Sequence, residues 1–119
     1  PVEIQPLNKP YANWTGGVFR ALVLADGEPV PFAEIEIEYL NHAVDIKGNA
    51  FGQQDYVTAP QASFKSLSTY SDAQGVVTIG LPRAGWWGIA ALNIGKTKTY
   101  KGKHLSQDAV LWVQAKDMK

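Results

Sequence analysis

Cysteine is absent from the sequence, and histidine occurs only twice, as His42 and His104. Without cysteine, a disulfide framework and a cysteine-ligated zinc site are both excluded. The chain also has no excess of either charge, because 11 Lys and Arg residues balance 11 Asp and Glu residues. A protein without net charge has no general field that attracts a polyanion, so we expect no nucleic-acid partner.

Long hydrophobic runs are missing too. Each apolar run is only a handful of residues, whereas a membrane-spanning helix needs roughly 18. We therefore expect no direct insertion of this domain into a membrane. The chain starts at Pro1 without Met and carries no signal peptide, so we expect a mature or trimmed product, from which a signal peptide or anchor could have been removed.

Helical periodicity over about eleven residues, the minimum for a clear helix pattern, is absent as well. Instead, turn residues separate short runs that are rich in β-branched and aromatic residues. With 119 residues, 45% of them hydrophobic, the chain is long enough to bury one core. We predict a single all-β domain over residues 1–119, a β-sandwich of about seven strands. The clearest strand candidates are residues 17–25, 33–40, 76–81, 86–94 and 109–115.

The strongest single pattern lies in residues 33–40. Alternation puts Ile35, Ile37 and Tyr39 on the core side of a strand and three glutamates on the other side. A row of carboxylates could also serve a metal ion or an acid–base reaction. Residues two apart in a strand lie about 7 Å apart, however, and need further partners for either task. We therefore interpret the glutamates as a solvated face.

Turn sequences predict how the strands are joined. Residues 26–27, Asp-Gly, and residues 72–75, which end in glycine, each predict a strand, turn, strand unit. The polar segment at 41–61 has no clean period and predicts one long loop, and loops of that length are often functional. Four lysines between positions 96 and 103 predict a solvated hairpin.

Catalytic motifs are scarce. Ser106 and Asp108 follow His104 at intervals of two residues, which in a strand places the side chains in a row. A nucleophile, a base and an orienting group need a triangle instead. Residues 95–97 match only the end of a phosphate-binding loop, whose first glycine would fall at position 90, which is Ala. We expect that the protein is not an enzyme.

The tryptophans have two possible roles. Trp86, Trp87 and Trp112 could form a ligand platform, but large aromatic side chains in a small sandwich are more often part of the core. Trp86 and Trp87 are consecutive, so in a strand they must face opposite sides. One of the two can lie in the core while the other is exposed.

Both histidines have an aspartate close by in the sequence. His42 opens the long loop with Asp45 three residues later, and His104 precedes Asp108 just before the final strand. Imidazole and carboxylate groups that converge on one point make a transition-metal site. If the fold brings the two pairs together, these four residues form a plausible N/O site for Ni, Co or Zn. A surface role for each histidine is the alternative.

Two sequence segments resemble known sandwich domains. Residues 26–37 resemble the "G-x-P-V-x-x-A-x-V-x-V" opening of transthyretin-like and carboxypeptidase-regulatory-like domains. Residues 71–79 and 81–88 are similar to the "T-D-x-x-G-x-F" turn of these domains and to the "G-x-W" strand that follows it. The resemblance implies an immunoglobulin-like, transthyretin-like (prealbumin-like) sandwich, and neither motif is catalytic.

A narrower resemblance covers residues 2–114. The chain is similar to a periplasmic family of unknown-function domains, described as NikM-type subunits or accessory proteins of nickel and cobalt uptake transporters. The most similar segments are residues 38–42, 81–88 and 100–113. Full-length members begin with an exported, histidine-bearing N-terminal region that this chain lacks. The resemblance therefore implies the C-terminal domain of a longer exported protein.

The resemblance and the two His-Asp pairs together predict a non-enzymatic component of nickel or cobalt uptake. Such a domain binds or delivers Ni or Co, with Zn as a ligand in vitro, or docks to a membrane-embedded metal transporter. Its expected location is the periplasm or another extracytoplasmic site, with any membrane anchor in a region absent here. A carbohydrate- or protein-binding module, using an exposed Trp and the 41–61 segment, and a structural spacer without a ligand are the alternatives.

Overall fold

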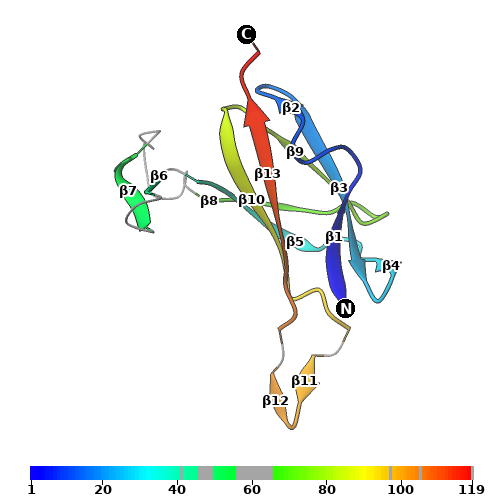
Figure 1. Cartoon of the computed structure of the whole chain (residues 1–119). Helices are drawn as coiled ribbons and strands as arrows, with labels where there is room; N and C mark the ends of the chain where they lie inside the picture. Colours follow the sequence, from blue (N-terminus) through cyan, green and yellow to red (C-terminus); the bar gives the residue numbers. More distant parts are fainter. Residues whose placement is uncertain (41, 46–49, 56–65, 97, 105, 119) are drawn as a thin grey trace.

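The computed structural model describes residues 1–40, 42–45, 50–55, 66–96, 98–104 and 106–118. The side chains of residues 42–45, 50–55, 66, 100 and 104 lie outside this description. Every regular element in the described part is a β-strand (Figure 1). The described residues form no helix with the length and hydrophobicity that would let it cross a membrane. The predicted all-β class is thus confirmed.

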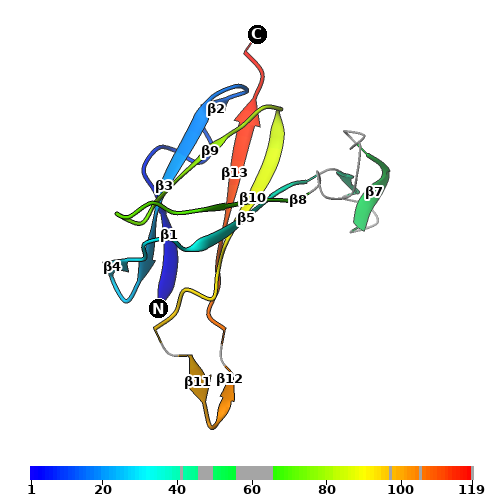
Figure 2. The same cartoon turned by 180° about the vertical axis from the view of Figure 1, so that it is seen from behind.

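Two sheets form the sandwich (Figures 1 and 2). The four-stranded sheet has β3 at its centre, paired with β1, β4 and β9. The five-stranded sheet has the order β2-β13-β10-β5-β8, and all its pairs are antiparallel except β2 with β13. The strands of the first sheet are β1 (Val2–Pro6), β3 (Val18–Ala25), β4 (Glu28–Pro29) and β9 (Val76–Gly80), and those of the second are β2 (Asn13–Trp14), β5 (Glu34–Tyr39), β8 (Ser66–Tyr70), β10 (Gly85–Leu92) and β13 (Ala109–Lys116).

Two small hairpins extend from the sandwich. One consists of β6 (His42–Asp45) and β7 (Ala50–Asp55), and the other of β11 (Thr99–Tyr100) and β12 (Lys103–His104). The hairpin predicted among the lysines is therefore confirmed. Its turn uses Lys101 and Gly102, both with positive φ (52° and 76°), and this is the backbone geometry that suits a two-residue hairpin turn.

The core lies between the two sheets and follows from side-chain alternation. Ile35 and Ile37 of β5 are buried, whereas Glu34 and Glu38 on the same strand are exposed, as the sequence predicts. Phe19 on β3, in the other sheet, is fully buried in the same cluster. Each buried side chain of this size contributes roughly 1.5–3 kcal/mol relative to an exposed position.

The number of strands and the long loop need correction. The two sheets together contain nine strands rather than about seven. The expected long loop is interrupted, because β6 and β7 occupy residues 42–45 and 50–55 of it. The remaining positions of that segment, 41, 46–49 and 56–61, lie outside the described residues.

The two predicted strand, turn, strand units are also different in the structure. The turn at residues 26–27 joins β3 to the short strand β4, and the chain then crosses to the other sheet to form β5. The turn at residues 72–75, in contrast to the β3–β4 turn, does not form a hairpin, because β8 pairs with β5 and β9 pairs with β3. Local sequence shows where a chain turns, but the pairing partner depends on which sheet receives the next strand.

Hydrogen bonds at Ser71 explain why the chain crosses here. Its Oγ accepts a hydrogen bond from the Ala33 N–H at 2.8 Å and donates one to the Val30 carbonyl at 2.8 Å. The backbone N–H of Ser71 donates to the Ala33 carbonyl at 3.0 Å. Ser71 is 2% exposed, and it thus joins the two segments that cross between the sheets.

We expect Ser71→Ala to lower the free energy of unfolding by about 1–3 kcal/mol, because the buried Ala33 N–H loses its acceptor. Urea unfolding followed by circular dichroism measures this loss. Ser68→Ala is the matched control, because Ser68 is exposed on β8. It should change the free energy of unfolding by less than about 0.5 kcal/mol. Equal losses in the two variants would contradict the role given to Ser71.

Candidate functional site

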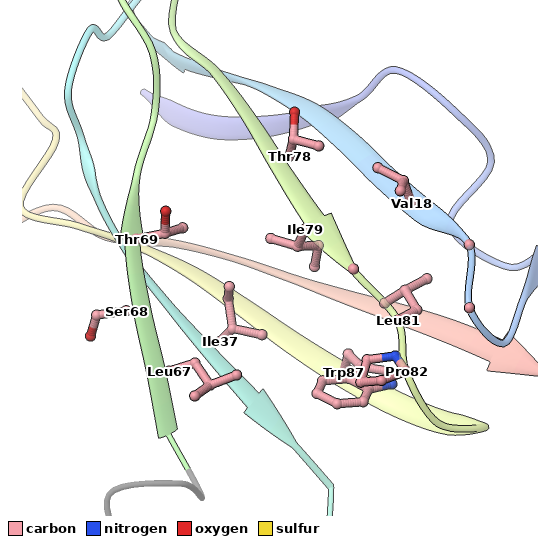
Figure 3. A pocket seen from close by; sticks show the side chains of 13 residues that line it. Val18, Ile37, Leu67, Ser68, Thr69, Thr78, Ile79, Leu81, Pro82 and Trp87 are labelled. Atoms are coloured by element: carbon pink, nitrogen blue, oxygen red, sulfur yellow. The ribbon is translucent and has the colours of Figure 1, made fainter.

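An apolar groove opens between β8 of one sheet and β9 of the other (Figure 3). Its volume is ≈ 580 Å³, within the range of small-molecule sites. Figure 3 shows Leu67 and Ile37 on one side and Ile79 and Leu81 on the other. Trp87 also lines the groove, and the remaining lining residues are Gly16, Gly17, Val18, Ser68, Thr69, Thr78, Gly80 and Pro82.

The groove exists because β8 and β9 lie at the edges of different sheets. Trp87 is held in place within it, since its Nε1–H donates to the Arg83 carbonyl at 3.0 Å and its ring lies 4.8 Å from that of Tyr39. The Tyr39 hydroxyl in turn donates to the Ala84 carbonyl at 2.7 Å. Among the described residues, no ionisable side chain lines this groove, and those that line it offer an apolar surface and hydroxyl groups.

The outer face of the five-stranded sheet carries exposed aromatic and aliphatic side chains. Trp112 and Val110 on β13 are 47% and 62% exposed. The Trp112 ring lies over Gly88 of β10, where a Cβ atom would come within 3.0 Å of Trp112 Cζ3. Next to this pair, Trp86 packs edge-on against Tyr11, with ring centroids 6.0 Å apart. The absence of a side chain at Gly88 thus gives the indole its place on the sheet.

Carboxylates lie on the same face, one strand further along. On β10, Gly88 lies between Glu38 of β5 and Trp112 of β13. Two residues further along, Ala90 lies between Glu36 of β5 and Val110 of β13. The three glutamates of β5 form no ion pair with another described residue. We call this surface the aromatic-acidic face; it consists of Tyr11, Trp86, Gly88, Ala90, Val110 and Trp112 with Glu34, Glu36 and Glu38.

Three of the four predicted metal ligands lie in two separate hairpins, and Asp108 directly precedes β13. His42 and Asp45 are the first and last residues of β6, and His104 is the last residue of β12. Figures 1 and 2 show the β6–β7 and β11–β12 hairpins at different ends of the molecule. The backbone therefore does not bring the two His-Asp pairs together. The side chains of His42, Asp45 and His104 lie outside the described residues, so ligation by them stays a prediction.

Asp108 is the one predicted ligand whose side chain the structure describes. Its Oδ1 accepts hydrogen bonds from the Asn93 N–H at 2.7 Å and from the Ser106 Oγ–H at 2.9 Å. These bonds join the end of β10 to the segment before β13, at the base of the β11–β12 hairpin. Within the part of the chain that is described, no group of three or more His, Asp or Glu side chains is placed to hold a metal ion.

Lysines lie in and around the β11–β12 hairpin. Lys96 Nζ lies 2.8 Å from Glu28 Oε2, and this hydrogen bond raises the pKa of Lys96. Lys98 Nζ donates to the Asn93 carbonyl at 2.6 Å. Because Lys96 and Glu28 are both exposed, the ion pair contributes little to stability.

The sequence pattern did not decide which tryptophan is exposed, and it did not indicate the groove. Trp87 is buried and Trp86 lies on the outer face, so the prediction of opposite sides is confirmed. The core role favoured for the tryptophans holds for Trp87 but not for Trp112, which is exposed. Residues 109–115 have apolar side chains on both faces, so alternation could not show which face is buried. The groove had no sequence signal, because it arises where the edges of two sheets meet.

Taken together, these features define an all-β sandwich domain with an apolar groove between its sheets and the exposed aromatic-acidic face on one of them. Comparison with known families gives a match to a family model described as a domain of unknown function (DUF4198), over residues 1–95. The chain therefore belongs to this family. The match covers β1 to β10 and ends before the β11–β12 hairpin. No curated protein and no solved structure matches the chain.

Gly88→Ala tests the placement of the Trp112 indole. The added methyl group would come within 3.0 Å of the ring, so we expect the ring to shift and the near-ultraviolet circular dichroism and the tryptophan emission to change. Gly80→Ala is the control, because a Cβ there meets no atom within 4 Å. If Gly88→Ala leaves both spectra as they are in the native protein, the indole does not lie over Gly88 in solution.

Proposed function

We propose that this domain is a non-enzymatic component of nickel or cobalt uptake. The observation that carries the proposal is the resemblance of residues 2–114 to domains associated with nickel and cobalt transporters, and the two His-Asp pairs support it. The family match itself assigns only a domain of unknown function. We further propose a transthyretin-like relationship for the sandwich and a periplasmic or other extracytoplasmic location.

The separation of the two pairs suggests the kind of metal site. A pair of one imidazole and one carboxylate, such as His42 with Asp45 or His104 with Asp108, leaves several coordination positions of Ni or Co open. A partner can fill these positions, so a two-ligand site suits delivery better than permanent storage. In this proposal the acceptor is a membrane-embedded metal transporter, to which the domain docks.

The free oxygen of Asp108 is compatible with this role. Both hydrogen bonds given for its carboxylate go to Oδ1, which leaves Oδ2 for a cation. The same bonds orient the carboxylate at the base of the hairpin that carries His104. Orientation of a ligand by neighbouring hydrogen bonds is a common property of metal sites.

Calorimetric titration of the domain with Ni, Co and Zn near pH 7.5, where an imidazole with its ordinary pKa of about 6.5 is mostly neutral, tests the proposal. We expect binding that weakens in His42→Ala and in His104→Ala and is lost in the double variant. Binding should also weaken below about pH 6.5, because protonated imidazole cannot bind a metal.

Glu36→Gln/Glu38→Gln is the matched control for the loss of metal-binding groups, since it removes two carboxylates that belong to neither pair. Metal binding in this control should equal that of the native chain. Absence of heat with all three metals, or equal binding by the native chain and the double histidine variant, would contradict metal ligation by these residues.

A further inference from the structure

The aromatic-acidic face is an exposed surface that the core does not explain. In an antiparallel sandwich the outer face of a sheet is ordinarily polar, because only the inner face is buried. Here the outer face carries Trp112 at 47% exposure and Val110 at 62%, with Trp86 and Tyr11 beside them. A contiguous apolar patch with a polar border is typical of an interaction site.

The sheet register places the aromatic and the acidic side chains side by side. Gly88 and Ala90 of β10 lie between them, and neither has a side chain longer than a methyl group. Trp112 and Val110 of β13 are on one side, with the Trp112 ring extending over Gly88. The opposite side is acidic and belongs to β5. The backbones of β13 and β5 are two strand spacings apart, about 10 Å, so an extended chain on this face can contact the ring and the carboxylates together.

The acidic side carries charges that the described residues do not neutralise. Glu34, Glu36 and Glu38 follow one another at intervals of about 7 Å on one face of β5. Neither ion pair that the structure gives, Lys96 with Glu28 or the amino terminus with Asp26, involves them. Three like charges in a row repel one another, and a cationic ligand would relieve this repulsion.

We propose that the aromatic-acidic face binds an extended basic segment of a partner protein. The exposed rings and the carboxylates, which no described residue neutralises, can both bind the same cationic side chains. Arginine and lysine side chains are attracted to the faces of aromatic rings and form charge-assisted hydrogen bonds with carboxylates. Arginine suits the face best, since its planar group stacks on an indole and bonds a carboxylate with two N–H groups.

This inference goes beyond the proposed metal function and does not depend on it, because the face contains none of the predicted metal ligands. A sugar chain is the other ligand that exposed indoles often bind. A neutral sugar would leave the three carboxylates without counter-charges, so the charge on β5 favours the basic segment.

The binding test uses the whole domain and an extended peptide of about twelve residues with alternating Arg and Thr, which places arginines on one side. Calorimetry in the presence of a chelator removes any contribution from metal ions. We expect the peptide to bind in about 20 mM NaCl, and at least about ten-fold more weakly in about 300 mM NaCl, because salt screens exposed charges. A peptide of alternating Glu and Thr should not bind.

Two pairs of variants locate the site. Glu36→Gln/Glu38→Gln should weaken binding about ten-fold, whereas Glu3→Gln/Glu28→Gln, which removes the same charge from the other sheet, should change it less than about two-fold. Trp112→Ala should weaken binding by about five-fold or more, and Leu7→Ala, an exposed apolar residue outside the face, should not. Circular dichroism confirms that each variant is folded.

Three results would overturn the proposal. The first is no binding of the basic peptide at low salt. The second is equal weakening by the two glutamate pairs, which would show attraction to the overall charge rather than to this face. The third is salt-independent binding of cellohexaose or xylohexaose that is lost in Trp112→Ala, with no binding of the peptide, which would assign the face to sugars.

Discussion

The buried hydroxyl of Ser71 joins the two segments that pass from one sheet to the other, and the rest of the arrangement depends on this junction. Its bonds to Ala33 and Val30 hold the β4–β5 crossing against the β8–β9 crossing. As a result, β5 and β8 are neighbours in one sheet while β9 pairs with β3 in the other. The apolar groove follows directly, because it lies between the edge strands β8 and β9 that this crossing separates.

The central strand β10 has residues in the core and residues on the aromatic-acidic face. Its inward residues, Trp87 and Ile89 among them, belong to the core, and its outward residues are small where Trp112 and the β5 glutamates flank them. The same alternation that buries one tryptophan therefore exposes the surface on which another can lie. A single strand therefore contributes side chains to the core and lies in the middle of the proposed peptide site.

The two proposed activities use different parts of the molecule. Metal ligation involves the small hairpins β6–β7 and β11–β12, which extend from the sandwich (Figures 1 and 2). The proposed peptide site lies on the sheet itself. Hairpins that extend from a rigid scaffold can reach a partner's ligands, whereas a flat sheet face suits a longer contact surface. One domain can thus present a metal and hold its partner at the same time.

The sequence by itself determined the all-β class, the strands β3, β5, β9, β10 and β13, the inward face of β5 and the lysine hairpin. Each of these follows from local alternation or from turn residues, which are properties of neighbouring positions. The pairing of β8 and β9 with different sheets, the groove between them and the exposure of Trp112 were decided only by the tertiary structure. They depend on which distant strands meet, and residues 109–115 are apolar on both faces, so no local pattern distinguishes inside from outside.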